Sequence, residues 1–219
     1  MDDERQYAAG GGVRGQAVRD DRESPADESD VGFRLVPANV DDVVWSAQAE
    51  AFFLPRADML PPDVLKAWFE ANPGGFFVLL GVNGTRAGHV EVLPLRPGVL
   101  RKLVNGQITE TQVSAKDIYP PDERSAISTL YISSMAICMP GRGRTEALRY
   151  VISHLRDVGE SLCPVGQVRL VYAIAATRRG RQLMDQLGFH VAVPGTKRQD
   201  GHDMLAIRGR TLIANTQHF

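Results

Sequence analysis

The chain has 219 residues, of which 43% are hydrophobic and 23% are charged, and its formal net charge is -1. This length fits one globular domain, and because no run of eighteen apolar residues occurs, we expect no helix that spans a membrane. The two cysteines, Cys138 and Cys163, are too few for a disulfide scaffold and lack the spacing of zinc ligands. We therefore expect no metal site and a reducing, cytoplasmic environment, in keeping with an acidic start that lacks the features of a secretory signal.

The negative charge is concentrated at the beginning of the chain. Residues 1–30 contain nine Asp or Glu residues and four Arg residues, which gives this segment a charge of -5 and leaves +4 for the remainder. The segment has few large apolar side chains, so we expect residues 1–31 to form a disordered acidic tail and residues 32–219 to form the folded domain. That domain has no basic block, which argues against nucleic acid as its partner.

The first half of the domain predicts strands and helices in alternation. A strand is expected over 33–36, then a helix over 42–53 with Asn39 or Asp41 as its cap, and a second helix over 62–71. Apolar runs over 76–82 and 85–95 are joined across Asn83 and Gly84, a strong β-hairpin signal. Residues 97–128 are irregular apart from a short helix over 99–104, and we interpret them as an insertion.

The second half predicts two units of strand, turn and helix. A buried strand over 129–137 leads through a glycine-rich turn into a helix with apolar positions from Ala147 to Leu155. A strand over 168–174 leads into a helix over 178–186, which Gly188 closes with a left-handed cap. Strands over 190–193 and 204–207 follow.

In this order of elements, two segments carry a resemblance to a known superfamily. They are Pro140-Gly141-Arg142-Gly143-Arg144-Thr145 and Gln182-Leu183-Met184-Asp185-Gln186-Leu187-Gly188-Phe189. Over about residues 32–209 the chain resembles the GNAT superfamily of acyl-CoA-dependent N-acyltransferases. The resemblance implies an α/β (α+β) fold with a mixed central sheet of six to seven strands, about four flanking helices, and the insertion 97–128 between the third and fourth strands.

The resemblance implies that the glycine-rich turn binds the pyrophosphate of acetyl-CoA. A helix N-terminus presents unpaired N–H groups and the positive end of a dipole, and glycine lets a phosphate approach closely. The implied binding residues are Gly141, Arg142, Gly143, Arg144 and Thr145. The family pattern is Arg or Gln, two residues, Gly, one residue, then Gly or Ala. We prefer the register that places Gly143 on its central glycine and Pro140 on its first position, although a register over 138–143 fits both glycines.

The strand before the turn is implied to hold the rest of the cofactor. By resemblance, Met135, Ala136 and Ile137 pair with the pantetheine arm through their main chains, and Met135 lies near the thioester. Thr177 stands where the family often has an Asn at the start of the later helix, and we include it among the cofactor-binding residues.

Transfer to an amine requires a base, and many family members use a Glu in the third strand. Glu91 is our choice of base because strand alternation directs it away from Val90 and Val92; the alternatives are a solvated residue or an ion pair with Arg86 or Arg101. His89 lies on the same face and is an alternative base, but our preferred interpretation is an exposed histidine.

The family's usual general acid is a Tyr in the last helix, and the aligned position here is Met184. Tyr172 is therefore our candidate acid, with Tyr131 as a second choice; both are strand residues that also suit packing. Aromatic side chains on the early helices either form an apolar acceptor wall or belong to the core, and these are Trp45, Phe52, Phe53, Trp68 and Phe69.

The sequence therefore predicts an N-acetyltransferase in which a primary amine of a small molecule or protein attacks the acetyl-CoA thioester directly. Because Met184 and Pro140 depart from the family pattern, the alternative is a catalytically silent module that binds acyl-CoA as a sensor. The partners implied are acyl-CoA and an unidentified amine acceptor, with neither nucleic acid nor a membrane, and the family suggests a homodimer.

Overall fold

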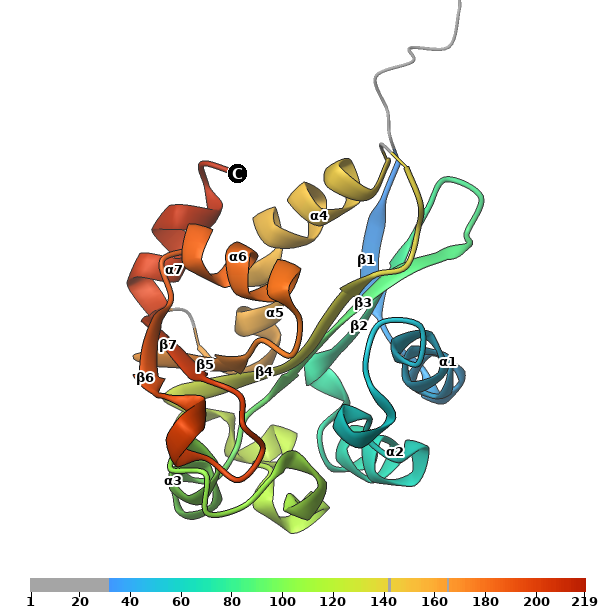
Figure 1. Cartoon of the computed structure of the whole chain (residues 1–219). Helices are drawn as coiled ribbons and strands as arrows, with labels where there is room; N and C mark the ends of the chain where they lie inside the picture. Colours follow the sequence, from blue (N-terminus) through green and yellow to red (C-terminus); the bar gives the residue numbers. More distant parts are fainter. Residues whose placement is uncertain (1–31, 142, 165) are drawn as a thin grey trace, which may run out of the picture. The chain divides into compact units, whose positions relative to one another are not determined.

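The computed structural model describes residues 32–219 except 142 and 165 (Figure 1). The acidic tail predicted over 1–31 and the phosphate-binding role predicted for Arg142 lie outside the described residues.

A single mixed sheet forms the centre of the domain (Figure 1). Its seven strands run in the order β1-β2-β3-β4-β5-β7-β6, and every neighbouring pair is antiparallel except β4 and β5. The strands are β1 (Arg34–Pro37), β2 (Phe76–Leu80), β3 (Arg86–Leu93), β4 (Thr129–Ile137), β5 (Leu170–Ile174), β6 (His190–Val193) and β7 (Met204–Arg208).

Seven α-helices accompany the sheet in the described part of the chain. They are α1 (Val40–Glu50), α2 (Pro62–Ala71), α3 (Pro97–Val104), α4 (Gly143–Ser153), α5 (Leu155–Leu162), α6 (Arg178–Gln186) and α7 (Gly209–Thr216). Short 3₁₀ turns lie at Arg56–Asp58, Pro73–Gly75, Glu110–Gln112, Ala115–Asp117, Pro121–Ala126 and Gly195–Lys197.

The helices cover the two faces of the sheet, and each face has its own apolar core. On one face, Val151 of α4, Leu155 of α5 and Met184 of α6 pack with inward-facing residues of β3, β4 and β5. On the other face, Val43 of α1 and Leu65 of α2 pack with α3 and the insertion. Figure 1 shows α1 and α2 on the side of the sheet opposite α4. The sheet is thus the middle layer of three, as expected for this class.

The predicted elements are present, with the bounds of α2, β4, α6 and β6 as expected and those of the other elements shifted by a few residues. Asn39 is the cap of α1: its side chain accepts from the N–H groups of Asp41 and Asp42. The hairpin turns at Gly84 with φ 71°, and Gly188 has φ 88°, the left-handed conformation that favours glycine.

The helices outnumber the four or so that the resemblance implied. The helix predicted from Ala147 to Leu155 is in fact the end of α4 followed by α5, with His154 as the break between them. The short helix of the insertion, α3, and the C-terminal α7 make up the rest. These additions enclose the sheet without changing the strand order that the resemblance implied.

Candidate active site

The parallel strands β4 and β5 pair for only part of their length. Their register runs from Thr129 opposite Leu170 to Ile132 opposite Ala173. Beyond that point β4 continues to Ile137 and remains paired with β3 on its other side. Among the described residues, the last five positions of β4 therefore have no strand beside them on the β5 side, and the sheet opens there.

The main chain of β4 directs two residues into this opening. The N–H of Cys138 donates a hydrogen bond of 2.7 Å to the carbonyl of Ala87 in β3. Because hydrogen-bonding groups alternate between the two sides of a strand, Ala136 also faces β3, whereas Met135 and Ile137 direct their N–H and C=O groups toward the gap. Of the three strand residues predicted to meet the cofactor, two thus present unpaired main-chain groups.

The glycine-rich turn follows the open end of β4. Gly141 has φ 75°, and a Cβ at this position would meet no atom within 4 Å. Gly143 is the first residue of α4, Arg144 the second, and Thr145 is exposed in the same first turn. Open space therefore lies at Gly141, just before the N-terminus of α4. The N–H of Arg144 donates to the carbonyl of Gly141 at 3.3 Å, and a Cβ at Gly143 would lie 2.8 Å from the end of the Met139 side chain.

The helix after β5 begins in a comparable way. Thr177 is the N-cap of α6, and its Oγ1 accepts a hydrogen bond of 3.0 Å from the N–H of Gly180. The hydroxyl proton of Thr177 is not used by this bond. Thr177 is therefore a helix cap in the structure, and its predicted contact with the cofactor remains a prediction.

Five buried or half-buried polar side chains lie between α1 and the sheet, and we name them the α1 polar cluster: Ser46, Glu50, His89, Glu91 and Ser134. Ser46 Oγ donates to Glu91 Oε1 at 2.7 Å. His89 Nε2 is 2.9 Å from Ser134 Oγ and 3.3 Å from Glu50 Oε1. Ser134 also donates its hydroxyl proton to Glu50. The cluster thus joins α1, β3 and β4.

The register explains why these groups meet. Glu91 is opposite Ser134, and His89 is opposite Ala136. Residues opposite each other in a sheet point to the same face, so Glu91, His89 and Ser134 all point to the face that α1 covers. A register shift between Glu91 and Val92 places an extra β4 residue, Ser133, at this point. The irregularity coincides with the place where β4 separates from β5.

His89 and Glu91 are each 2% exposed, so the expectation that His89 is exposed is wrong. The ion pair considered between Glu91 and Arg86 is also absent from the described contacts, because Arg86 pairs with Asp42 at 2.8 Å. Glu91 Oε2 and His89 Nδ1 have no hydrogen-bond partner in the described part of the chain. Both residues line a cavity of about 10 Å³ beneath α1, close to the smallest volume that holds a water molecule.

Burial sets the charge of these groups. It raises the pKa of Glu91 to about 7, although His89 and the Ser46 hydrogen bond act in the opposite direction. Burial alone lowers the pKa of His89, but Cys138, Glu50 and Glu91 outweigh it, so the pKa of His89 is raised. The Cys138 thiol forms no well-aligned hydrogen bond to the ring, and we attribute the effect chiefly to the two carboxylates. The raised pKa favours the protonated form of His89.

The two positions considered for the general acid lie on opposite faces of the sheet. Tyr172 is half-buried in β5, opposite Tyr131, and packs against the α1–α3 side. Met184 is 5% exposed and belongs to the apolar core on the α4–α7 side. A tyrosine at position 184 would consequently enter the core rather than the opening between β4 and β5.

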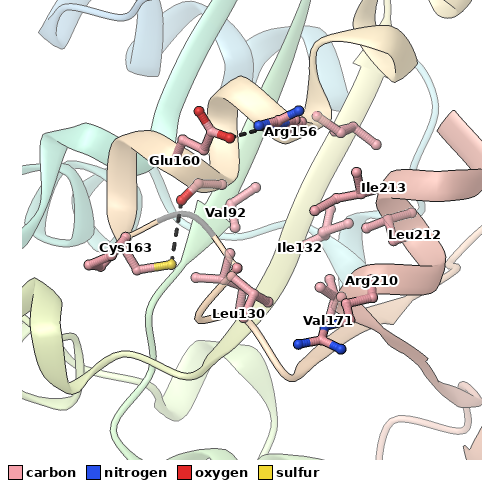
Figure 2. A pocket seen from close by; sticks show the side chains of 16 residues that line it. Val92, Leu130, Ile132, Arg156, Glu160, Cys163, Val171, Arg210, Leu212 and Ile213 are labelled. Carbon is pink, nitrogen blue, oxygen red and sulfur yellow. Dashed lines mark hydrogen bonds and ion pairs between the residues drawn. The ribbon is translucent and has the colours of Figure 1, made fainter. Parts of the chain in front are cut away.

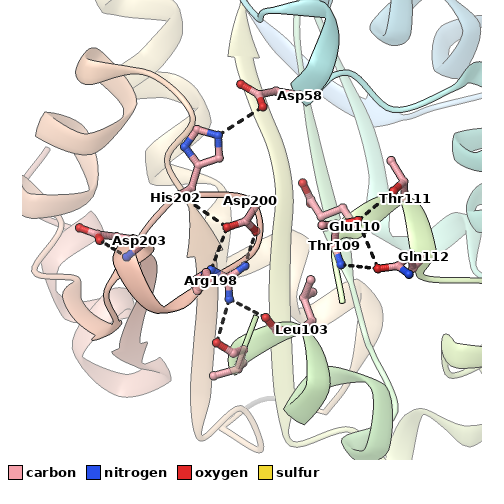
Figure 3. Close-up of polar contacts among 12 residues, drawn as sticks. Asp58, Leu103, Thr109, Glu110, Thr111, Gln112, Arg198, Asp200, His202 and Asp203 are labelled. Carbon is pink, nitrogen blue, oxygen red and sulfur yellow. Dashed lines mark hydrogen bonds and ion pairs between the residues drawn. The ribbon is translucent and has the colours of Figure 1, made fainter. Parts of the chain in front are cut away.

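The insertion and the β6–β7 connection form a polar wall on the α1–α3 side (Figure 3). Arg198, 6% exposed, donates to the carbonyl of Val104 at 2.8 Å and pairs with Asp200. His202 lies 3.3 Å from Asp58, in the turn that follows α1. The Arg198 contact attaches the insertion to the β6–β7 connection, and the His202 contact attaches that connection to the turn after α1.

The aromatic residues of the early helices are divided between the core and the surface. Trp68 is fully buried and donates its indole N–H to the carbonyl of Val113, so it belongs to the core. Phe52 and Phe53, just after α1, are 85% and 39% exposed. The guanidinium of Arg144 lies 5.8 Å from the Phe53 ring, which brings this turn beside the start of α4.

An apolar pocket of about 60 Å³ lies elsewhere, between α5, α7 and the first residues of β4 and β5 (Figure 2). Leu130, Val171 and Leu212 line it, together with Cys163. No residue predicted for catalysis or cofactor binding lines this pocket. We therefore do not assign the pocket to the active site.

Among residues 32–219 without 142 and 165, no three His, Cys, Asp or Glu side chains are grouped so as to bind a metal ion. No helix among the same residues is long and apolar enough to cross a membrane.

Three solved structures illustrate what the domain is similar to. The loading GNATL domain of CurA from Lyngbya majuscula aligns with a TM-score of 0.56 at 13% identity, over 85% of this chain and 99% of that one. The GNAT-like decarboxylase GphF in complex with isobutyryl-CoA gives 0.53 at 14% identity, over 80% and 98%. The chain has the GNAT fold. A chimeric spermidine N-acetyltransferase from Vibrio cholerae SpeG and hSSAT gives 0.50 at 11% identity, over 83% and 98%.

No protein-family model and no curated protein sequence matches the chain. The GNAT fold is therefore detected through its three-dimensional structure, while sequence identity to these neighbours stays between 11% and 14%.

Proposed function

We propose that this protein is an N-acyltransferase that binds acetyl-CoA in the opening between β4 and β5 and transfers the acetyl group to a primary amine. The proposal rests chiefly on the separation of the two strands after Ile132 and Ala173. That separation leaves the main-chain groups of Met135 and Ile137 available to an extended ligand, a short distance in sequence before the N-terminus of α4.

The chemistry of CoA suits this arrangement. Its pantetheine arm carries amide groups that pair with a strand edge, and its pyrophosphate is an anion that a helix N-terminus stabilises. In our proposal Met135, Ala136 and Ile137 bind the arm, while Gly141, Arg142, Gly143, Arg144 and Thr145 bind the phosphates. Thr177, at the start of α6, faces the arm from the β5 side. The isobutyryl-CoA complex of GphF supports acyl-CoA as the ligand class.

Glu91 is proposed as the base that takes a proton from the attacking amine. A base is needed because the ammonium form of an amine has no lone pair to attack the thioester. With a pKa raised to about 7, Glu91 is partly ionised at neutral pH and is a better base than an exposed carboxylate. The small cavity beside it has room for one water molecule between the carboxylate and an acceptor.

The first test is ligand binding, measured as a shift in thermal unfolding with CoA, acetyl-CoA and longer acyl-CoAs. A ligand that binds the folded state raises its apparent stability by mass action, so we expect an upward shift that grows with concentration. The same titration with Gly143→Glu should lose the shift, because the added carboxylate is placed against the phosphates.

The chain offers a matched control for that substitution. Gly98 lies in the first turn of α3, and a Cβ there would meet no atom within 4 Å, whereas a Cβ at Gly143 would lie 2.8 Å from the end of the Met139 side chain. Gly143→Ala therefore accompanies the pair, and it should keep the CoA shift if charge rather than bulk is what abolishes it. Gly98→Glu adds the same charge to the first turn of another helix, and we expect its CoA shift to equal that of the wild type. Loss of the shift in both variants, or in neither, would contradict a phosphate site at α4.

The second test separates an enzyme from a silent binding module. Release of CoA from acetyl-CoA is measured with a panel of primary amines, for example spermidine, phenethylamine and a lysine peptide. Release that depends on the amine and falls at least tenfold in Glu91→Gln supports the transferase. Binding of acetyl-CoA without turnover of any amine would favour the sensor alternative suggested by Met184 and Pro140.

A further inference from the structure

Acyl transfer leaves a thiolate on CoA, and the thiolate needs a proton. The position aligned with the family's tyrosine acid is Met184, whose side chain is buried in the core of the α4–α7 face. Another polar hydrogen must therefore be found close to the open end of β4. In the described part of the chain, Ser134 provides a hydroxyl at this point, adjacent to Met135.

We propose, resting on the transferase function above, that the Ser134 hydroxyl donates the proton to the departing CoA thiolate and that His89 supplies its replacement. Ser134 is then the catalytic residue, and His89 acts through it. Neither residue was predicted to have this role from the sequence.

The contacts form a continuous path for a proton. His89 Nε2 lies 2.9 Å from Ser134 Oγ, which is normal hydrogen-bond distance. Ser134 lies two positions past Ile132, the last β4 residue paired with β5, so it belongs to the part of the strand that borders the opening. Its side chain is half-buried, whereas His89 is 2% exposed.

The step balances without any further reactant. The bond between the thioester carbon and sulfur breaks, and its electron pair stays on sulfur. The sulfur then takes the Ser134 hydroxyl proton, and Ser134 Oγ takes the proton of His89 Nε2. His89 becomes neutral and regains a proton from the one that the attacking amine releases to Glu91. In the net reaction, one ammonium substrate and one acetyl-CoA give one amide, one CoA thiol and one proton released to solvent.

The charges around His89 favour a proton there before the reaction. Glu50 faces the ring from α1, Glu91 from β3 and Cys138 from the residue just after β4, and Asp42, which pairs with Arg86, lines the same cavity. The two carboxylates closest to the ring stabilise the imidazolium, so its pKa is raised despite burial. Glu50 also accepts the Ser134 hydroxyl in the resting state, which holds Ser134 beside His89.

The competing donor is Tyr172, which lies on the same side of the sheet. Its β-sheet partner is Tyr131, and this pair lies inside the region where β4 and β5 are still joined. Ser134 lies beyond that region. Tyr172→Phe is therefore the natural comparison for Ser134→Ala, because each substitution removes one hydroxyl.

The experiment uses the full chain, acetyl-CoA and hydroxylamine as acceptor. Hydroxylamine is small and already neutral at pH 7, so its attack needs little help from a base and the departing thiolate dominates the outcome. Acetylhydroxamate and free CoA are both quantified. We expect Ser134→Ala to lower kcat by about a hundredfold or more, the scale of general acid catalysis, with an unchanged KM for acetyl-CoA.

Two further readouts separate proton donation from a structural role. Ser134→Thr keeps a hydroxyl on the same carbon and should retain most of kcat, while Tyr172→Phe should lose less than threefold. In the wild type, kcat should fall at alkaline pH as His89 loses its proton, and this fall should be absent in Ser134→Ala. The CoA-induced thermal shift of every variant verifies that it folds and binds.

The outcomes distinguish this inference from the proposed function. Unchanged kcat in Ser134→Ala, or an equal loss in Ser134→Thr, overturns the proton path and leaves the transferase standing. A large loss in Tyr172→Phe with activity kept in Ser134→Ala assigns the acid to Tyr172 instead. A wild-type protein that shifts with CoA but acetylates neither hydroxylamine nor any amine overturns both.

Discussion

The hydroxyl of Tyr131 donates a hydrogen bond of 2.7 Å to Oε1 of Glu110, and this bond joins the central strand β4 to the insertion. Tyr131 is 1% exposed, and burial raises the pKa of Glu110 to about 7 even though the bond to Tyr131 acts in the opposite direction. The insertion is therefore packed into the domain through a carboxyl group whose charge changes near neutral pH.

The first prediction concerns the pH dependence of stability. The folded-state pKa of Glu110 is raised above its unfolded value, so its stabilising contribution is complete below about pH 4.5 and is lost as pH rises through about 7. Glu110→Gln keeps an acceptor for Tyr131 but removes the charge. Between pH 5 and pH 8 we expect the variant to gain up to about 3 kcal/mol in unfolding free energy relative to the wild type, measured by urea denaturation.

The control is Glu123, an exposed carboxylate whose pKa is lowered by its hydrogen bonds to Arg96. Its contribution is present above about pH 4.5 and is lost only as pH falls. Glu123→Gln should accordingly show no pH trend between 5 and 8. A parallel trend in both variants would refute a special role of the half-buried Glu110.

The second prediction concerns the pH dependence of transfer. If Glu91 is the base, the rate with the best amine of the panel rises as pH increases through about 7, where Glu91 ionises. Ser46 donates to the Glu91 carboxylate at 2.7 Å and lowers its pKa. Ser46→Ala should consequently displace the rise to higher pH, as measured from CoA release across pH 6 to 9.

Ser133 provides the matched control for this shift. Its hydroxyl donates to the main-chain carbonyl of Glu91 at 3.2 Å and does not touch the carboxylate. Ser133→Ala should leave the midpoint of the pH profile in place. An identical displacement in both variants would mean that the profile reports a general disturbance of the strand.

The third prediction concerns the attachment of the insertion. Arg198→Ala removes the donor to the carbonyl of Val104 and leaves Asp200 without its partner, so we expect a loss of about 2 kcal/mol or more in unfolding free energy. Gly106→Ala should cost a similar amount, because Gly106 has φ 67° and a Cβ there would lie 2.6 Å from Arg198 Cα. Arg96→Ala breaks an exposed pair and should cost less than about 1 kcal/mol.

The fourth prediction concerns the residue aligned with the family's acid. Met184→Tyr introduces a larger, polar side chain into a closed core and should destabilise the domain by about 1–3 kcal/mol. We expect no gain in transfer to hydroxylamine. A rate increase with unchanged thermal stability would show that position 184 reaches the cleft after all.

Much of the fold follows from local patterns. The helix over 62–71 was predicted to the residue because Pro62 starts it and Asn72-Pro73 stops it, and the hairpin because Asn83-Gly84 suits a tight turn. The junction of α4 and α5 was missed because apolar spacing continues through His154, which reads as one uninterrupted helix.

The residues of the candidate site likewise fall into two groups, those that the sequence predicts and those that only the fold brings together. The sequence predicts Gly141 and Gly143 from their spacing before a helix, and Glu91 from strand alternation. It does not predict which residues lie next to Glu91, because Ser46 and Ser134 are 45 and 43 positions away in the chain. They come close to Glu91 only after α1 packs on the sheet and β3 pairs with β4. The serine pair in β4 was the one sequence signal for Ser134, as two polar residues within an apolar strand.

The amino-acid sequence by itself thus determined the order of strands and helices and the glycine turn before α4, since caps, turns and apolar periodicity act between residues close in the chain. Only the tertiary structure decided where β4 leaves β5, that His89 is enclosed beneath α1, and that Glu110 reaches Tyr131. Burial and charge depend on which distant segments come together, and no short stretch of sequence carries that information.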